Sequence, residues 1–189
     1  MNVFIPFEVS GKVRQAFRDR GHNAWSCDIQ EPDDGSNYHL QGDYRKFVNY
    51  LPWDIMIAFP VCTAVCVSGN GTYAGTEARE QGVQDFIEVY NLPIEKKCLE
   101  NPVGVISTRF MKPTQYVQPW MFGHKECKKT GLWLVGLPKL KPTNIVGPPL
   151  PHERKDWEKV WRMAPSETRS KDRAETNQGL ADAMAEQWG

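Results

Sequence analysis

The residues best suited to chemistry in this sequence follow four short apolar segments that are predicted to be β-strands. Residues 8–11 (EVSG) follow the first segment, Asp28 ends the second, residues 60–62 (PVC) follow the third and residues 100–102 (ENP) follow the fourth. Open α/β sheets bind ligands at the carboxyl ends of their strands, where an acidic side chain after the second strand can hydrogen-bond ribose hydroxyls. Cysteine is a strong nucleophile and a carboxyl group exchanges protons, so the same edge carries groups for covalent and acid–base catalysis.

Each of these positions also has an ordinary structural interpretation. Asp28 by itself is typical of a turn, Ser10-Gly11 is typical of a helix start, and an isolated Cys62 is typical of a small buried apolar side chain. The chain contains neither G-x-G-x-x-G nor G-x-x-x-x-G-K-[ST], so the sequence supports neither a dinucleotide fingerprint nor a phosphate-binding loop. The functional interpretation therefore depends on several positions acting together.

Alternating strand and helix patterns are expected to place these sites on one sheet. A strand over residues 3–7, helical spacing over 12–20 and a strand over 24–27 form the β–turn–α–β unit of a parallel sheet. Residues 54–59 (DIMIAF) are apolar after the first position and stop at Pro60. Such a run is typical of a central strand covered on both faces. The other predicted elements are helices over 44–50, 77–90, 153–161 and 180–188, and strands over 97–99 and 132–135. This order predicts an α/β fold with a mostly parallel sheet flanked by helices.

The segments between these elements are predicted to be loops. Residues 30–41 are polar and rich in turn formers, residues 61–75 are rich in glycine, and residues 138–151 contain repeated prolines. Residues 165–177 are charged and polar, and we expect them to be mobile.

Length and charge set further bounds on the protein. The chain has 189 residues, with 23 basic and 23 acidic side chains and a formal net charge of zero. This length corresponds to one domain, and the composition is that of a globular protein rather than a disordered one. Because there is no strong overall positive field, any attraction of nucleic acid must come from a local basic patch.

The cysteines and the absence of long apolar runs favour a cytoplasmic protein. The five cysteines are an odd number, the N-terminal segment does not resemble a secretory signal, and no run approaches 18 uninterrupted apolar residues. We therefore expect no membrane span and reduced thiols in a reducing compartment.

In their order and spacing, several segments resemble the motifs of the cytosine-5 DNA methyltransferases. The segments that carry the resemblance are 7–11 (FEVSG), 20–22 (RGH), Asp28, Gly42-Asp43, 54–62 (DIMIAFPVC, similar to the family's strand ending in Pro-Pro-Cys), 99–103 (LENPV, similar to its Glu-Asn-Val motif) and 178–185 (QGLADAMA, similar to its last motif). The resemblance implies a Rossmann-like, S-adenosylmethionine-dependent methyltransferase fold. It also implies a catalytic core over residues 1–137, a proline-rich and charged linker over 138–177, and a C-terminal helix over 178–189 that packs back on the core.

The resemblance further implies an activity and a set of site residues. Members of this family methylate carbon 5 of cytosine in DNA, and this chain looks like an abbreviated member of the kind found in bacteriophage genomes. By resemblance, Cys62 is the nucleophile that adds to carbon 6, Glu100 contacts ring nitrogen 3, and Asn101 holds the loop. The implied cofactor-binding residues are Phe7, Glu8, Ser10, Gly11, Asp28, Asp43 and Pro60.

The sequence departs from the family pattern in three places. Pro60-Val61 stands where the family usually has Pro-Pro, and residues 126–130 (ECKKT) keep one basic position of its Gln-x-Arg-x-Arg motif. The interval over residues 138–177 is too short for the family's target recognition region. We therefore expect DNA (duplex or single-stranded) or a free pyrimidine nucleotide as the substrate, with a partner chain as one source of target recognition.

Basic and aromatic residues gather in the second half of the chain. Such a set is typical of a groove that tracks a phosphate backbone, and it is equally typical of an ordinary solvated surface. The expected nucleic-acid contacts are Arg109, Lys128 and Lys129.

Three alternatives remain open from the sequence. Cys62-x-x-x-Cys66 and His124-x-x-Cys127 have ligand types that could close a tetrahedral zinc site, which would exclude Cys62 as a nucleophile. The same covalent chemistry could act on a free pyrimidine nucleotide. The chain could also be a nucleic-acid-binding accessory module whose catalytic site has decayed.

Overall fold

A twisted seven-stranded sheet forms the centre of the molecule. The computed structural model describes residues 1–158, 163 and 175–189. The strand order is β3-β2-β1-β4-β5-β7-β6; β3 to β5 are parallel, and β7 is antiparallel to both of its neighbours. The strands are β1 (Asn2–Pro6), β2 (Asn23–Asp28), β3 (His39–Gln41), β4 (Ile55–Ala58), β5 (Lys97–Pro102), β6 (Gln115–Val117) and β7 (Thr130–Val135). The structure confirms an α/β fold with a mostly parallel sheet.

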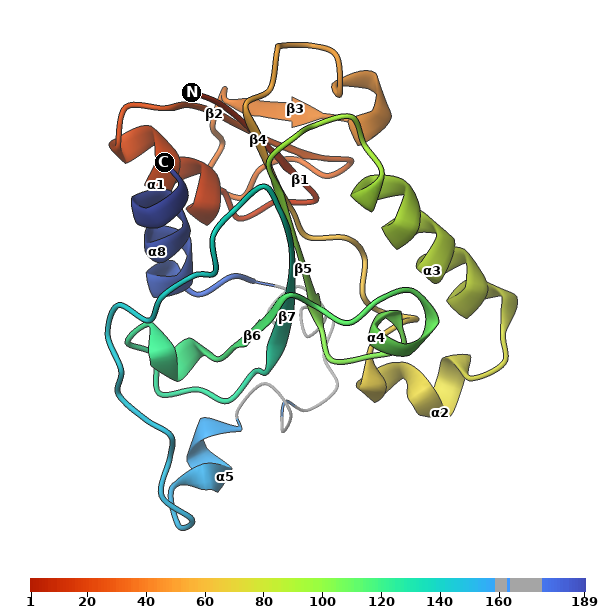
Figure 1. Cartoon of the computed structure of the whole chain (residues 1–189), viewed down its shortest axis with the longest axis vertical. Helices are drawn as coiled ribbons and strands as arrows, with labels where there is room; N and C mark the ends of the chain where they lie inside the picture. The colour runs from red at the N-terminus through yellow and green to blue at the C-terminus, as the bar shows by residue number, and fades with distance from the viewer. Residues whose placement is uncertain (159–162, 164–174) are drawn as a thin grey trace.

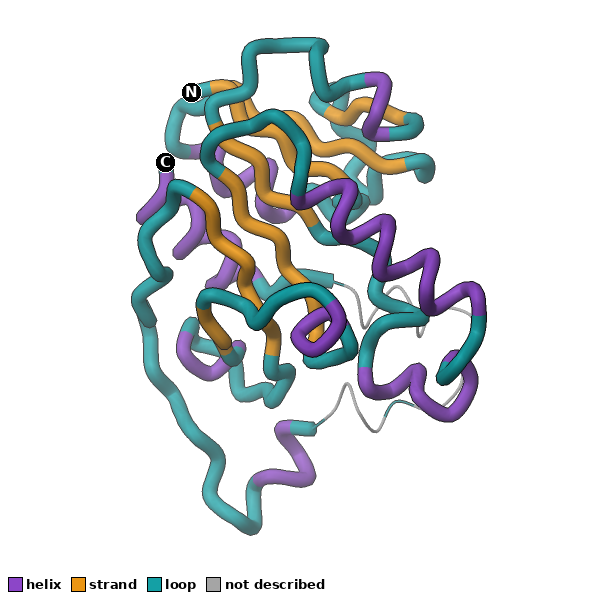
Figure 2. Tube along the Cα trace, turned by 45° about the vertical axis from the view of Figure 1, so that its right-hand side comes forward, coloured by secondary structure: helices purple, strands orange, loops and turns teal. Residues whose placement is uncertain are grey.

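Helices cover both faces of the sheet because its strands carry apolar side chains on both sides. Along β1, Val3 and Ile5 pack with one apolar cluster and Phe4 packs with the other. Helices α1 (Lys12–Asp19) and α8 (Gln178–Trp188) cover the first face, and α3 (Glu77–Tyr90) covers the second (Figure 1). In Figure 2, α3 is seen as a long helix that lies beside the strands of the sheet. Every described helix is too short or too polar to cross a membrane.

Helix α8 is part of the core although it lies far from α1 in the sequence. Its small and apolar side chains are buried against α1, and the two chain ends lie on the same side of the molecule (Figure 1). The Trp188 indole N–H donates to the Pro138 carbonyl at 3.0 Å. The buried residues of α8 are Leu180, Ala181, Ala183, Met184, Ala185 and Trp188. Helix α8 therefore packs on the sheet as part of the core. The domain boundaries expected at residues 137 and 177 stay predictions.

The irregular segments differ from the sequence expectations. The polar segment over residues 30–41 ends in β3, because the backbone of β2 pairs with it although it has no apolar alternation. Residues 61–75, predicted as a loop, contain a 3₁₀ turn (Val67–Gly69) and α2 (Asn70–Tyr73). The short helix predicted over 44–50 is a single 3₁₀ turn (Tyr44–Lys46).

Other differences lie in the second half of the chain. Helix α4 (Ile106–Arg109), strand β6 and a 3₁₀ turn (Pro119–Met121) were not anticipated, because each is too short to show periodicity. The helix predicted over 153–161 appears as α5 (Arg154–Trp157), and residues 159–162 lie outside the described residues. Most of the segment predicted to be mobile, 165–174, also lies outside them.

The turn between β1 and α1 is organised by a buried carboxylate. Glu8 is only 4% exposed, and its two carboxylate oxygens accept from the backbone N–H groups of Val13 at 2.7 Å and Arg14 at 3.2 Å. Gly11 precedes the helix with φ +70°, a backbone conformation that favours glycine. The fully buried Arg14 guanidinium lies beneath this turn, donates to Ser26 Oγ at 2.9 Å and pairs with Asp34. The two backbone contacts satisfy N–H groups at the helix start that have no partner within the helix.

We predict that the free energy of unfolding depends on pH through Glu8. Burial raises the pKa of Glu8 to about 7, although its backbone hydrogen bonds oppose the rise. The folded state therefore binds a proton that the unfolded state releases between pH 4.5 and 7. It follows that this group lowers stability as the pH rises through that window, by up to about 3 kcal/mol.

Chemical denaturation of the Glu8→Gln variant at pH 5 and pH 7.5 tests this prediction. The variant should lose part of the decline in stability between the two pH values, because the amide does not titrate. The exposed Glu31→Gln variant is the matched control and should follow the wild-type curve. A wild-type slope in Glu8→Gln would show that Glu8 is not the responsible group.

Candidate active site

The ends of β4 and β5 bring Cys62 and Glu100 to the same edge of the sheet. The two strands pair in parallel, with Ala58 opposite Leu99. The chain leaves the sheet after Ala58, whereas residues 100–102, expected to follow the strand, continue β5 beside β7. Asn101 is fully buried, and its Nδ2 donates to the Pro60 carbonyl oxygen at 3.0 Å. This hydrogen bond ties the turn that carries Cys62 to the strand that carries Glu100.

The surroundings of the Cys62 thiol favour its protonated form. It is partly exposed, and it hydrogen-bonds the thiol of Cys66. That hydrogen bond and burial raise the pKa of the Cys62 thiol, and the negative charge of Glu100 raises it further. The positive charge of Lys128 acts in the opposite direction. Nucleophilic use of Cys62 therefore requires removal of its proton.

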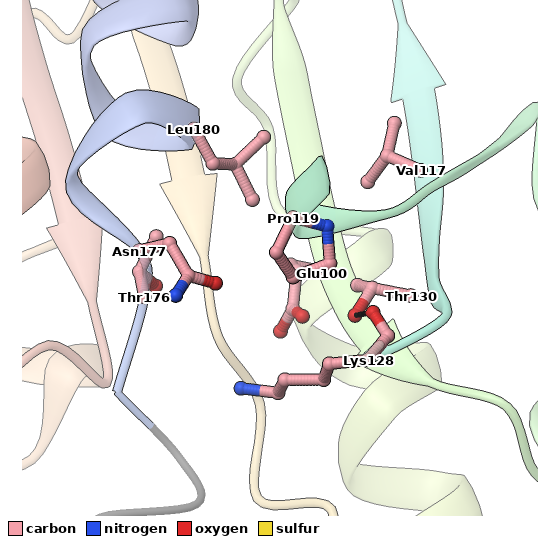
Figure 3. A pocket seen from close by; sticks show the side chains of 8 residues that line it. All are labelled: Glu100, Val117, Pro119, Lys128, Thr130, Thr176, Asn177 and Leu180. Atoms are coloured by element: carbon pink, nitrogen blue, oxygen red, sulfur yellow. Dashed lines mark hydrogen bonds between the residues drawn. The ribbon is translucent and has the colours of Figure 1, made fainter. Parts of the chain in front are cut away.

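Glu100 lines a small pocket between β5, β7 and the start of α8. Burial raises the pKa of the Glu100 carboxyl, whereas Lys128 and a hydrogen bond with Thr130 lower it. Figure 3 shows the Glu100 carboxyl directed between Lys128 and Pro119, with Thr176 and Asn177 on the opposite side. The residues that line the pocket are Glu100, Val117, Pro119, Lys128, Thr130, Thr176, Asn177 and Leu180. The burial of Glu100 therefore favours the protonated form of its carboxyl, which can donate a hydrogen bond.

The segment after Cys62 is held down by backbone contacts with the segment after Glu100. Val67 N donates to the Val103 carbonyl at 2.9 Å, and Val105 N donates to the Val65 carbonyl at 2.9 Å. Gly104 makes this close approach possible, because a Cβ there would overlap the Val65 carbonyl oxygen. The two segments that carry the candidate nucleophile and the candidate acid are therefore joined by hydrogen bonds both at β4 and β5 and beyond these strands.

Arg79 holds the segment after Cys62 through hydrogen bonds from α3. It lies in the first turn of α3 and is 4% exposed; its Nε donates to the Ala64 carbonyl at 2.8 Å and its Nη1 donates to Asn70 Oδ1 at 2.9 Å. Sequence reasoning missed Arg79, Thr130, Thr176 and Asn177. A buried arginine has no signature in helical spacing, and the pocket residues contact Glu100 only through the tertiary fold.

The residues predicted to hold a cofactor lie at the carboxyl edge of β1, β2 and β3, but their side chains differ in availability. Phe7 has a positive φ of 65° and packs against Tyr44, and Asp28 is partly exposed after β2. The Asp43 carboxylate is held by Arg45 at 3.1 Å. Glu8 faces the interior and caps α1, as described above.

The remaining predicted cofactor residues act through their backbone or lie elsewhere. The Ser10 hydroxyl accepts weakly from Lys12 N at 3.5 Å, and Gly11 sits over the Arg14 guanidinium. Pro60 is buried at the end of β4 and contributes its carbonyl to Asn101. A carboxylate at Asp28 and an aromatic ring at Phe7 fit a nucleoside, because the first can accept from ribose hydroxyls and the second presents an apolar face. Glu8 does not belong to that set.

The three predicted nucleic-acid contacts have different environments. Lys128 lines the pocket and donates to the Glu175 carbonyl at 3.2 Å. The Lys129 ammonium lies 4.4 Å from the centroid of the Tyr116 ring at the exposed edge of the sheet. Arg109 is paired with Glu80 on the surface. Lys128 therefore lies at the candidate site, whereas Lys129 lies over Tyr116 outside the pocket lining and Arg109 has an acidic partner.

The four residues of the zinc alternative do not form a site. Cys62 adjoins Cys66, but His124 Nε2 accepts from the backbone N–H of Gly179 at 2.9 Å, and Cys127 is within electrostatic range of Arg154 and Glu158. Within residues 1–158, 163 and 175–189, no three His, Cys, Asp or Glu side chains gather as metal ligands do. The spacing in the sequence was misleading because His124 positions the start of α8.

Comparison with solved structures identifies the fold. The sequence matches no family model and no curated protein. A structure described as a DNA modification methyltransferase encoded within a prophage (E. coli) aligns over 77% of this chain and 51% of its own, with a TM-score of 0.50 and 15% identity. The Entamoeba histolytica methyltransferase EhMeth aligns over 77% of this chain and 57% of its own, with a TM-score of 0.52 and 13% identity.

These alignments establish the architecture but not the activity. The chain spans about half the length of the solved structures that it matches. Sequence identity in both cases is low, so the shared property is the arrangement of the sheet and helices. The chain shares the Rossmann-like fold of these two methyltransferases.

Proposed function

We propose that this chain is the catalytic core of a DNA methyltransferase that modifies carbon 5 of cytosine through a covalent bond to Cys62. The observation that carries the proposal is the junction of Cys62 with Glu100, made by the Asn101–Pro60 hydrogen bond across β5 and β4. A nucleophile and an acid at neighbouring strand ends are what addition to a pyrimidine ring requires, because carbon 5 alone is a poor nucleophile. The fold supports methyl transfer in general, and these two groups support this form of it.

In the proposed reaction the chain activates the pyrimidine ring before methyl transfer. The Cys62 thiolate adds to carbon 6 of the ring, and Glu100 in its protonated form donates a hydrogen bond to ring nitrogen 3. Asn101 keeps the Cys62 turn at a constant place relative to Glu100. Lys128 favours the thiolate of Cys62 through its positive charge.

The residues at the edge of β1, β2 and β3 would hold the cofactor. Asp28 would accept from the ribose hydroxyls, with Phe7 and Asp43 beside the adenosine and the turn of Ser10 and Gly11 near it. S-adenosylmethionine, when bound, supplies an electrophilic methyl group to carbon 5. Loss of the carbon 5 proton and release of the Cys62 thiol then restore the aromatic ring.

The substrate in this proposal is cytosine in DNA, recognised with help from outside the chain. A base in DNA would reach Glu100 only by leaving its stack, as in other enzymes that act on bases. Lys128 lines the pocket and Lys129 lies over the exposed Tyr116 ring, and both ammonium groups can contact phosphates. A partner chain would supply the target recognition that the interval over residues 138–177 is too short to provide.

We predict that Cys62→Ser abolishes covalent capture. Wild-type protein mixed with S-adenosylmethionine and DNA containing 5-fluorocytosine should form a stable adduct, because fluorine at carbon 5 prevents release. Serine is too weak a nucleophile to add under the same conditions. Denaturing gel electrophoresis and peptide mass mapping measure the adduct. The matched control is Cys127→Ser, which changes another partly exposed cysteine and should leave the adduct intact.

The same assay separates the alternative functions. Adduct formation with a fluorinated free nucleotide and none with duplex or single-stranded DNA would replace the proposal by nucleotide modification. DNA binding with neither an adduct nor calorimetric binding of S-adenosylmethionine would leave an accessory module. An adduct at a cysteine other than Cys62 would overturn the assignment of the nucleophile.

We predict that Glu100→Gln lowers kcat for methyl transfer by about 10²-fold or more, the usual contribution of a positioned acid. Because burial raises the pKa of Glu100, its active protonated form is lost as the pH rises through that pKa, so wild-type kcat should fall on the alkaline side. The variant should lose that limb of the pH–kcat profile. Glu126→Gln is the control, since Glu126 hydrogen-bonds Asn177 without lining the pocket. An unchanged alkaline limb in Glu100→Gln would assign it to another group.

A further inference from the structure

The thiols of Cys62 and Cys66 are in direct contact one helical turn apart. Cys66 N donates to the Cys62 carbonyl at 2.9 Å, which closes a turn between the two residues, and their side chains are hydrogen-bonded to each other. A turn of this kind separates the Cα atoms by about 6 Å. That separation lies within the roughly 4.4–6.8 Å that disulfides span. The backbone turn therefore places the two cysteines within the Cα range that a disulfide spans.

The surroundings of the pair favour oxidation. Cys66 Sγ is 3.0 Å from Ser68 Oγ and 3.7 Å from the Thr63 carbonyl oxygen. The Ser68 hydroxyl can donate to a thiolate on Cys66 once the thiol has lost its proton. Cys62 is partly exposed, and Val61 beside it is 69% exposed, so a small molecule reaches the pair from solvent. By contrast, Cys27 and Cys98 are fully buried in the core. Among the five cysteines, only these two have a described contact with another cysteine.

We propose that Cys62 and Cys66 are a site of oxidative modification at which a hydroperoxide converts the two thiols into an intramolecular disulfide. The Cys66 thiolate attacks the outer peroxide oxygen, the O–O bond breaks, and an alcohol leaves with the proton from Cys66, which leaves a sulfenic acid on Cys66. Cys62 sulfur then attacks Cys66 sulfur, the S–O bond breaks, and hydroxide leaves with the Cys62 proton as water. Both sulfurs are oxidised by one electron each, and the peroxide is reduced by two.

The disulfide would mask the sulfur that the proposed function uses as nucleophile. This consequence rests on the proposed function, whereas formation of the disulfide does not. A reducing thiol would return both cysteines and restore the site. Segment contacts that hold residues 65–67 to residues 103–105 would keep the turn in place during the cycle.

Hydrogen peroxide added to the full chain tests the modification site. We expect peptide mapping to recover a Cys62–Cys66 linked peptide with the mass of two hydrogens lost, and iodoacetamide labelling of Cys62 to disappear. Dithiothreitol should restore both the labelling and the capture of fluorocytosine DNA. Sulfinic or sulfonic acid on Cys62 without a link, or a link between other cysteines, would overturn the proposal.

Variants sharpen the test and separate it from the proposed function. Cys66→Ala and Cys66→Ser should both block the link while Cys62 remains open to iodoacetamide, and Cys127→Ser should form the link as the wild type does. If either Cys66 variant fails to fold, the wild-type peptide map decides. A reversible Cys62–Cys66 link in a protein that never captures fluorocytosine would support the modification site and overturn the proposed function. Capture by reduced protein without a peroxide-induced link would do the reverse.

Discussion

The hydrogen bond from Asn101 to the Pro60 carbonyl is the contact on which the geometry of the candidate site depends. It crosses from β5 to the turn after β4, inside a region that excludes water, and it satisfies two polar groups at once. Leaving either group unpaired in such a place costs about 1–3 kcal/mol, so the turn has a strong reason to remain where it is. Because Cys62 lies two residues beyond Pro60 and Glu100 directly precedes Asn101, this contact also sets the position of one group relative to the other.

The electrostatics of the site follow from that closeness. The hydrogen bond with Cys66, burial and the negative charge of Glu100 raise the pKa of the Cys62 thiol, and burial raises the pKa of the Glu100 carboxyl. Lys128 opposes this for both groups. These shifts favour the protonated form of each group, so Cys62 must lose its proton before it acts as a nucleophile. The same few side chains therefore control how readily the Cys62 thiol loses its proton.

Much of the regular structure could be predicted because it leaves periodic signals. Helix α3 begins and ends where its spacing predicts, and β4 is buried on both faces as its apolar sequence predicts. The short elements β3, β6 and α4 could not be predicted, since three or four residues show no period and their hydrogen-bond partners are distant in sequence. The roles of Cys62 and Glu100 stay predictions; what the sequence indicated was a reactive residue type near the end of a strand, and Glu100 lies within β5 rather than after it.

The sequence by itself determined the α/β architecture and the edge of the sheet that carries reactive side chains, because both depend on local patterns along the chain. Only the tertiary structure decided what those side chains do there. It turned Glu8 inward onto the start of α1, committed His124 to the start of α8, and brought Cys66 against Cys62. It also closed the Glu100 pocket with Lys128 and Asn177, which are far apart along the chain. Such contacts depend on which segments pack together, and no spacing within one segment encodes them.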